Sequence, residues 1–189
     1  MLGASRGCAI NVRPTDFSRL NINGVDMKTV LFARHAKSNW NEAGISDFDR
    51  PLNSRGEEDA PRMASYLEQS AYVIDQIISS DAARALATAT EYKNCLTPDE
   101  EIIHKHSLYM ASHLDIAEVV QNISSKYSSV MIVGHNPGMS EIVDYYVAGS
   151  VQDMPTCSIA VIQFDVSDWK EIKIGKGDLL AFEYPKKLT

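Results

Sequence analysis

The sequence is short of cysteine, and the cysteines that it has are scattered. Cys8, Cys95 and Cys157 are the three cysteines among 189 residues, and no two of them form a CxxC pair. An odd number of distant cysteines argues against the disulfide framework that small secreted proteins use. We therefore expect reduced cysteines and a cytoplasmic location.

Two further absences limit the partners. Lys and Arg number 18 against 25 Asp and Glu, so the formal net charge is −7 and no overall positive charge favours nucleic acid or an anionic membrane surface. No run approaches the roughly 18 apolar residues of a membrane-spanning helix. The N-terminus also lacks the apolar segment of a secretory signal. We expect neither a nucleic-acid partner nor a membrane partner.

What the sequence does contain is the composition of a globular domain. Hydrophobic residues make up 44% and charged residues 23%, and a chain of this length can fold without a disulfide or a structural metal. The first part differs, because it combines several Arg, Gly and Asn residues and has no apolar periodicity. We expect a loose extension over residues 1–26 and one domain over residues 27–189. Alternatively, residues 10–12 add an edge strand.

The apolar pattern predicts strands that alternate with helices. Short apolar runs predict strands at residues 28–33, 75–79, 102–106, 129–133 and 158–164. Helical spacing predicts helices at residues 56–70, 81–95, 113–126 and 137–147, the first of them capped by Ser54. Residues 169–174 and 179–182 look like an antiparallel pair around a turn at residues 175–177. Because the apolar runs do not alternate with polar residues, we expect the α/β class, with a mostly parallel sheet in a three-layer αβα sandwich.

Polar side chains that could carry chemistry follow directly after the predicted strands. Arg34 and His35 follow the first strand, Arg84 lies one turn into the helix after the second, and His135 follows the strand that Gly134 ends. In open α/β sheets, ligands bind beyond the carboxyl ends of the strands. These four side chains should therefore meet at one edge of the sheet.

Each of these residues alone has an ordinary structural explanation, but the set suits phosphate chemistry. Guanidinium groups match phosphate oxygens in pairs, and neutral imidazoles supply a nucleophile and a hydrogen-bond donor. Backbone N–H groups at the helix start near Asp81 would add donors in the same region. Phosphoryl transfer needs mainly positioning and positive charge, which this set provides.

Several motifs in this order resemble the histidine phosphatase superfamily, which has the phosphoglycerate mutase-like fold. Residues 34–41 (RHAKSNWN) resemble the family's R-H-G-x-S-x-x-N motif, and residues 134–136 match its G-H-N element. Residues 52–56 (LNSRG) and 80–89 (SDAARALATA) resemble two further motifs between them. The run DFDRPL at residues 47–52 makes the sequence most similar to the small bacterial SixA-type phosphohistidine phosphatases.

The resemblance implies a role for each matching residue. His35 would be the nucleophile and would form a phosphohistidine intermediate, while Arg34, Arg84 and His135 would bind the phosphoryl group with help from Asn41. No metal ion and no cofactor is expected. The positive charges of Arg34 and Arg84 should lower the pKa of His35, which would keep its imidazole neutral and nucleophilic.

The general acid stays open. The interval of 51 positions from Arg84 to His135 leaves no room for the cap insertion that carries this acid in larger members of the family. The candidate acids are Asp47, Asp49, Asp115 and Glu118. Asp49 is the first choice, because its loop follows the nucleophile.

A site without a strong acid favours a weakly basic leaving group. An alkoxide needs a proton donor, whereas imidazole leaves as a neutral ring whose conjugate acid has a pKa of about 6.5. We therefore favour a phosphatase that removes phosphate from phosphohistidine in a signalling protein. The alternatives are a small-molecule phosphomonoesterase and a non-catalytic phosphate-binding module, and the sequence leaves the oligomeric state open.

Two weaker signals are interpreted as structural. His104 and His106 could form a metal pair, but the sequence places no third ligand, so we expect surface histidines. The core is expected to be filled in part by Met110, Met131, Met139 and Met154.

Overall fold

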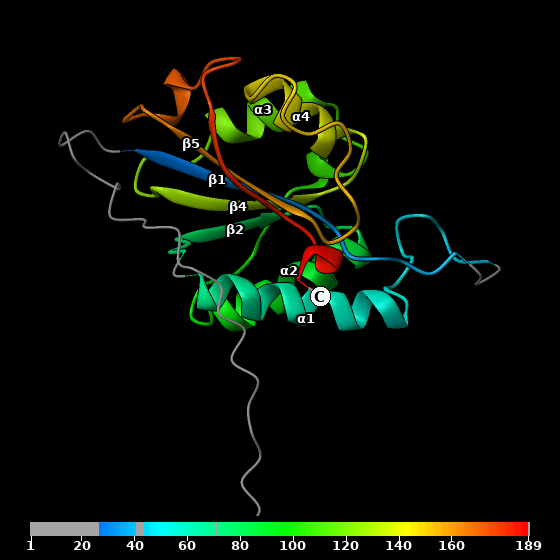
Figure 1. Cartoon of the computed structure of the whole chain (residues 1–189). Helices are drawn as coiled ribbons and strands as arrows, with labels where there is room; N and C mark the ends of the chain where they lie inside the picture. Colours follow the sequence, from blue (N-terminus) through cyan, green and yellow to red (C-terminus); the bar gives the residue numbers. More distant parts are fainter. Residues whose placement is uncertain (1–26, 41–43, 71, 189) are drawn as a thin grey trace, which may run out of the picture.

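The computed structural model describes residues 27–40, 44–70 and 72–188. The expected extension at residues 1–26, with its alternative strand, lies outside the described residues, and so does the predicted phosphate ligand Asn41. The described part forms three layers, a central sheet between two pairs of helices (Figure 1). This arrangement confirms the expected α/β class and the αβα sandwich.

The sheet of the described residues has six strands in the order β3-β2-β4-β1-β5-β6. The strands are β1 (Lys28–Arg34), β2 (Gln76–Ser79), β3 (Ile103–His104), β4 (Ser129–Gly134), β5 (Ile159–Phe164) and β6 (Asp178–Glu183). The first four strands in this order are parallel to one another, whereas β5 is antiparallel to β1 and to β6. The parallel strands therefore end at one common edge.

Two helices cover each face of the sheet (Figure 1). The helices are α1 (Ser54–Gln69), α2 (Ala83–Leu96), α3 (His113–Gln121) and α4 (Gly138–Tyr146). α1 packs beside α2 on one face, and α3 packs beside α4 on the other. Among the described residues, no helix is both long and apolar enough to cross a membrane.

Each face of the sheet has its own hydrophobic core. Successive residues of a strand point to opposite faces, so Leu31 and Ala33 of β1 pack under α1 and α2. Val30 and Phe32 of the same strand pack under α3 and α4. Burial on both faces explains why the strands are continuous apolar runs without a polar alternation.

The start of α1 differs from the prediction. Ser54 is already helical, and the cap is Asn53, whose side chain accepts a hydrogen bond from the Gly56 backbone N–H at 3.0 Å. A short amide side chain caps a helix at least as well as a hydroxyl. Gly56 lies so close to the Lys37 carbonyl group that a Cβ atom there would overlap it. The first turn of α1 is therefore packed directly on the loop after β1.

α3 is shorter than the pattern predicts, because it ends at Gln121 and not at residue 126. Beyond it the chain forms a turn, in which the Tyr127 N–H donates to the Ser124 carbonyl at 3.1 Å. Ile123, just before this turn, keeps the helical spacing and is buried. The apolar spacing thus continues past the end of the helix, which is why the sequence predicts a helix that is too long.

The C-terminal segment differs most from the prediction. Residues 169–174 are not a strand, because a short 3-10 turn begins at Trp169, whose ring is fully buried. β6 pairs with β5 instead. The N–H groups of Gly175 and Gly177 bond to carbonyls at the end of α4, so this segment is not a hairpin turn. A buried side chain that anchors a turn leaves the same apolar trace in a sequence as a strand does.

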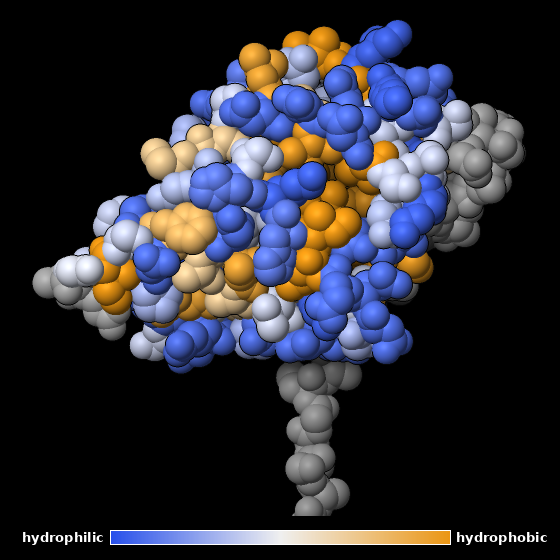
Figure 2. Space-filling model, turned by 180° about the vertical axis from the view of Figure 1, so that it is seen from behind, coloured by the Kyte–Doolittle hydropathy of each residue, from blue (hydrophilic) through white to orange (hydrophobic). Residues whose placement is uncertain are grey.

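One edge of the sheet is formed by β3, which has only two residues. Ile103 of this strand is partly exposed and lines a groove of about 570 Å³ together with Ile78 and Val119. Figure 2, which views the molecule from behind, shows apolar side chains in the middle of a mainly hydrophilic surface. A short edge strand presents few free backbone groups, which limits pairing with another chain.

Candidate active site

The four side chains predicted from the strand ends meet at the carboxyl edge of the parallel strands. In the register of β1 and β4, Arg34 lies opposite Gly134, and the His35 N–H donates to the Gly134 carbonyl at 3.0 Å. Arg34, His35, Arg84 and His135 all line one pocket of about 330 Å³. Their predicted convergence is therefore confirmed.

His35 has a defined tautomer. Its Nδ1 lies 2.7 Å from the Ala36 carbonyl oxygen, which can only accept, so the ring proton is on Nδ1. Nε2 then carries a lone pair, and it accepts a hydrogen bond from Arg84 Nε at 3.3 Å. The ring is buried. The unprotonated nitrogen thus lies beside a guanidinium group that lines the same pocket.

Burial lowers the pKa of His35 to about 3, because the charged ring would lose its water. The hydrogen bond to the Ala36 carbonyl opposes this shift, whereas the positive charges of His135, Arg84 and Arg34 add to it. The predicted direction is confirmed, but the arginines are a secondary cause. His35 is neutral at pH 7.

The backbone after His35 is anchored on α2. The Ala36 N–H donates to Thr88 Oγ1 at 3.0 Å, and the Thr88 hydroxyl donates to the Arg84 carbonyl at 2.7 Å. All three residues are buried. The loop that carries His35 and the helix that carries Arg84 therefore keep a fixed relative position.

Arg84 joins His35 to the loop that precedes α1. Its Nη1 donates to the Asp47 backbone carbonyl at 2.5 Å, and its Nη2 donates to Asp47 Oδ2 at 3.0 Å. α2 begins at Ala83, two residues after the predicted start, and the Ala83 N–H bonds to the Phe48 carbonyl at 3.0 Å. This N–H group, which we expected to be available for a ligand, holds the loop instead.

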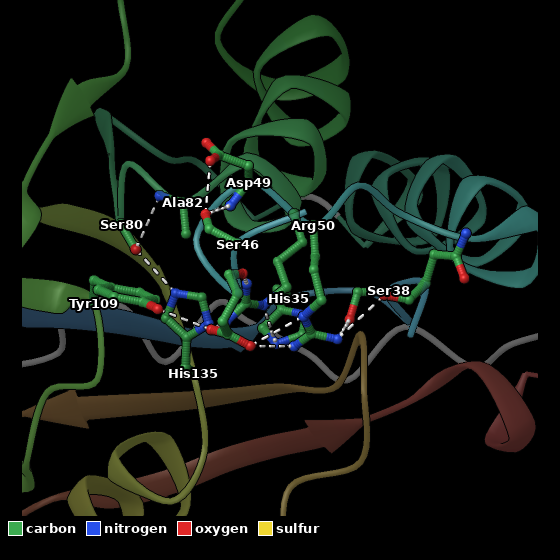
Figure 3. A network of polar contacts seen from close by, with 12 residues as sticks. His35, Ser38, Ser46, Asp49, Arg50, Ser80, Ala82, Tyr109 and His135 are labelled. Atoms are coloured by element: carbon green, nitrogen blue, oxygen red, sulfur yellow. Dashed lines mark hydrogen bonds and ion pairs between the residues drawn. The ribbon is translucent and has the colours of Figure 1, made fainter. Parts of the chain in front are cut away.

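Asp47 lies at the centre of a network of charged hydrogen bonds. Its Oδ1 accepts from Arg50 Nε at 3.0 Å and lies 2.8 Å from Arg50 Nη2. Its Oδ2 accepts from the Tyr109 hydroxyl at 2.8 Å. Arg50 also donates to Ser38 Oγ at 3.0 Å, and Figure 3 shows Ser38, Arg50 and Tyr109 near His35. The network connects the loop after β1 with the segment that precedes α3.

Asp47 is the candidate acid that the structure brings to the pocket, but it is ionised. Burial favours its neutral form, yet the Tyr109 hydrogen bond and the positive charges of Arg84 and Arg50 outweigh burial and lower the pKa of Asp47 to about 2. Among the described residues, it is the one carboxylate that lines this pocket. At neutral pH it can accept hydrogen bonds but has no proton to donate.

The other candidate acids lie elsewhere. Asp49, the first choice from the sequence, accepts a hydrogen bond from Ser46 Oγ at 2.6 Å and does not line the pocket (Figure 3). Asp115 forms a capping box with Ser112 at the start of α3. Glu118 is exposed on the same helix. The structure thus does not bring these three carboxylates to His35.

His135 faces His35 with a ring-to-ring distance of 4.9 Å. The Ser80 hydroxyl oxygen accepts from the Ala82 N–H at 3.3 Å and lies 2.9 Å from His135 Nε2, so its proton is free to be donated to that nitrogen. When Ser80 donates in this way, the proton of the neutral ring is on Nδ1; this nitrogen is buried and has no partner in the described part of the chain. Burial, and then the charge of Arg84, lower the pKa of His135 to about 4.

Arg34 is less completely bonded than Arg84. Its Nη1 donates to the Met154 carbonyl at 2.5 Å. Its Nε is buried and has no hydrogen-bond partner among the described residues. Burial lowers the pKa of Arg34, and Asp153 opposes this shift. A buried N–H of a cation beside His35 is suited to an anionic ligand.

One of the methionines does not fill the core. Met131, Met139 and Met154 are fully buried, as expected. Met110 is 78% exposed and lines the mouth of the pocket. The sequence interpretation of Met110 is therefore wrong, because it follows a short 3-10 turn and not a buried element.

The histidine pair near β3 lies on the surface of the described part of the chain. His106 Nδ1 lies 2.9 Å from Asp81 Oδ2, and its side chain is exposed. The described ranges contain no group of three or more His, Cys, Asp or Glu side chains that could hold a metal ion. The expected surface position of His104 and His106 is confirmed.

The sequence prediction missed Arg50 and Tyr109. Arg50 lines the pocket, and Tyr109 contacts both the carboxylate of Asp47 and the ring of His135. Arg50 had a signal, because it lies in the DFDRPL run. Tyr109 had none, since it is 62 positions from Asp47 and follows no strand directly.

The sequence has recognisable relatives. Residues 30–108 match the Histidine phosphatase superfamily (branch 1). An uncharacterized chloroplastic protein of Arabidopsis thaliana is 31% identical over 166 residues, which make up 83% of this chain and 75% of that protein. The match to this relative covers most of the described domain.

Solved structures with the same fold include two SixA proteins. The crystal structure from Agrobacterium tumefaciens that carries the name phosphohistidine phosphatase SixA is 27% identical, with a TM-score of 0.73 and coverage of 84% of this chain and 98% of that one. The protein histidine phosphatase SixA complexed with tungstate is 24% identical, with the same TM-score and coverage of 85% and 99%. A sequence identity of 24% shows that the two proteins share a fold and shows no more than that.

Proposed function

Since the chain belongs to the histidine phosphatase superfamily and is a phosphatase, we propose that it removes phosphate from phosphohistidine in a protein, with His35 as nucleophile and without a metal ion. One observation carries the proposal. Among the described residues, the pocket pairs the unprotonated Nε2 of neutral His35 with guanidinium groups and contains no protonated carboxyl group.

The reaction has two displacement steps. The Nε2 lone pair of His35 gives up its hydrogen bond from Arg84 Nε and attacks the phosphorus atom. The P–N bond of the substrate breaks, and its electrons leave with the substrate ring. Water then attacks the phosphorus on His35, the P–Nε2 bond breaks, and dihydrogen phosphate leaves with both protons of the water. N–H groups of Arg34, Arg84 and His135 bind the phosphoryl oxygens in both steps, where negative charge is concentrated.

Without a protonated carboxyl group in the pocket, the reaction favours a leaving group that needs no proton. Asp47 is ionised, so no carboxyl group of the described pocket can protonate an alkoxide at neutral pH. A phosphohistidine ring that carries a proton on its other nitrogen leaves as neutral imidazole and needs no donor. This chemistry favours a P–N bond over the P–O bond of a phosphomonoester.

The charge distribution supports a single phosphoryl group as ligand. The chain carries −7 overall, yet Arg34, Lys37, Arg50 and Arg84 line the pocket against the one carboxylate of Asp47. The positive potential is therefore local. A protein substrate with a neutral or basic surface around its phosphohistidine would fit this arrangement better than a polyanion.

The test compares phosphohistidine with phosphomonoesters. Histidine-containing peptides phosphorylated with phosphoramidate, and small phosphomonoesters such as glucose 6-phosphate, are offered to the purified chain, and kcat/KM is measured for each. We expect a higher kcat/KM on the phosphohistidine peptides. A much higher value on the small phosphomonoesters would refute the substrate proposal and support the phosphomonoesterase.

The covalent step is tested separately. Brief reaction with a ³²P-labelled phosphohistidine peptide should leave acid-labile label on the wild-type chain and none on His35→Ala. His104→Ala, which changes a histidine outside the pocket, is the matched control and should be labelled normally. Label that persists in His35→Ala would exclude His35 as the nucleophile.

A further inference from the structure

The geometry points to Asp47 as a positioning residue that holds the guanidinium group of Arg84 in the orientation in which it contacts His35. The inference rests on the proposed function, because it takes His35 as the nucleophile. Asp47 acts through Arg84 and is not itself required to touch the phosphorus or the leaving group.

Arg84 is held from two directions. Toward the nucleophile, its Nε donates to His35 Nε2 at 3.3 Å. On the other side, its two terminal nitrogens donate to the backbone carbonyl and to the carboxylate of Asp47. Because a guanidinium group is planar, fixing both terminal nitrogens also fixes the direction of the Nε–H bond. Asp47 therefore determines where His35 receives its hydrogen bond.

These contacts leave Arg84 able to bind a phosphoryl group. Each terminal nitrogen carries two N–H groups, and the contacts with Asp47 account for one on each. The side chain is buried and lines the pocket. A guanidinium group that is already oriented loses little conformational freedom when the ligand binds, so its full charge acts on the reaction.

Asp47 is itself fixed in place. Arg50 binds Oδ1 through two nitrogens, and the Tyr109 hydroxyl binds Oδ2. The next residue, Phe48, accepts the Ala83 N–H at the start of α2. The loop is thus attached to the same helix that carries Arg84, which gives the carboxylate a constant position relative to the guanidinium group.

A carboxylate among guanidinium groups could act in the opposite way, as an internal competitor of the phosphoryl group. Removing its charge would then tighten anion binding and raise kcat/KM. The positioning role predicts a lower kcat, because Arg84 Nη2 would lose its carboxylate acceptor and the backbone carbonyl that Nη1 keeps would not by itself hold the guanidinium group toward His35. The two roles therefore differ in the sign of the effect.

The experiment measures phosphoramidate hydrolysis by the full chain in Asp47→Ala, Asp47→Asn and Asp49→Ala. We expect kcat to fall about 10²-fold in Asp47→Ala, since a misplacement of this kind has that effect, with a smaller change in KM. Asp47→Asn keeps one acceptor oxygen and should lose only about tenfold. Asp49→Ala removes the neighbouring carboxylate, which binds Ser46 and no guanidinium group, and should keep its kcat.

The ¹⁵N chemical shift of His35 Nε2 gives a second measurement that does not depend on turnover. It should change in Asp47→Ala, where the bond from Arg84 is lost, and stay constant in Asp49→Ala. An unchanged or increased kcat in Asp47→Ala, or a lower kcat with an unchanged shift, would overturn the positioning role. Turnover that survives in His35→Ala would instead overturn the proposed function, so the two failures are distinguishable.

Discussion

The two sides of the pocket differ in how completely their polar atoms are bonded. On the Asp47 side, the guanidinium nitrogens of Arg84 and the carboxylate oxygens of Asp47 all have partners within the chain. On the opposite side, Arg34 Nε and His135 Nδ1 are buried and have no partner among the described residues. Both sides line the same pocket around His35.

The difference separates orientation from ligand binding. A buried N–H without a partner destabilises the fold by roughly 1–3 kcal/mol, so it is retained where a ligand completes it. The Asp47 side is therefore organised within the chain, and we propose that phosphate completes the Arg34 side. Mutations on the two sides should for this reason have different effects on stability.

The largest expected effect comes from the two arginines. Arg34→Met and Arg84→Met should each lower kcat/KM by about 10²–10³-fold, because each removes charge at the phosphoryl oxygens. Their free energies of unfolding should move in opposite directions, by about 1 kcal/mol each. Activity assays and urea unfolding measure both effects, and shifts of the same sign would contradict the comparison.

The opposite signs have a structural cause. Arg34→Met removes a buried, unpaired N–H. The Met154 carbonyl loses its hydrogen bond from Arg34 but still accepts one from the Asn136 amide at 3.2 Å. Arg84→Met takes a charged partner from Asp47. Arg34→Lys is the control that keeps the charge of the first site.

The next effect concerns stabilisation by inorganic phosphate. Phosphate that binds only the folded chain should stabilise it by about 2.7 kcal/mol at a concentration of 100 Kd. Arg34→Met should lose most of this stabilisation, measured as the phosphate-dependent rise in Tm. Lys170→Met, far from the pocket, is the matched control. An unchanged rise in Arg34→Met would mean that the unpaired N–H is not a ligand group.

A smaller effect is expected from acidification. The folded pKa values of His35 and His135 are about 3 and about 4, below the unfolded value, so between these values and about pH 6.5 the unfolded chain binds protons that the folded chain does not. Stability is then complete above about pH 6.5 and falls on acidification, by at most about 1.4 kcal/mol per pH unit for each histidine. Urea unfolding at pH 7 and at pH 5 measures this loss in the free energy of unfolding.

The matched variants identify the source of this pH dependence. His135→Gln should reduce the loss of stability between pH 7 and pH 5, whereas His104→Gln, outside the pocket, should leave it unchanged. Equal losses in the wild type and His135→Gln would mean that burial does not depress the pKa of His135.

The smallest effect is expected from chelation. We propose hydrolysis without a metal ion, and the described residues contain no group of three or more His, Cys, Asp or Glu side chains that could hold one. EDTA should therefore leave kcat unchanged. Strong inhibition that added Mg²⁺ or Zn²⁺ reverses would require a different assignment of the pocket.

The convergence of Arg34, His35, Arg84 and His135 could be predicted from the sequence because it follows from topology. Parallel strands end at one edge, so a residue directly after such a strand is placed there, and so is the first turn of the following helix, where Arg84 lies. The main cause of the pKa shift of His35 could not be predicted. The sequence shows which charges lie near the ring, but it does not show how far the fold excludes water from it.

The Asp47 network could not be predicted, because it depends on side-chain packing between distant loops. The sequence favoured Asp49 over Asp47 because of its position in the loop. In the structure, the carboxylate of Asp47 binds Arg84, whereas that of Asp49 binds Ser46. Tyr109 reaches the same carboxylate from a segment without any motif. Trp169 shows the complementary limit, since a buried aromatic residue fits a turn and a strand equally well.

The hydrogen bond from His35 Nδ1 to the Ala36 carbonyl has a consequence for the chemical form of the phosphorylated chain. With Nδ1 occupied, only the far nitrogen of the ring is open to phosphorus, so the intermediate should be the tele isomer of phosphohistidine and not the pros isomer. Antibodies that discriminate the two isomers would then detect the trapped chain with one reagent and miss it with the other. In the proposed mechanism, one backbone carbonyl thus determines which nitrogen of His35 receives the phosphoryl group.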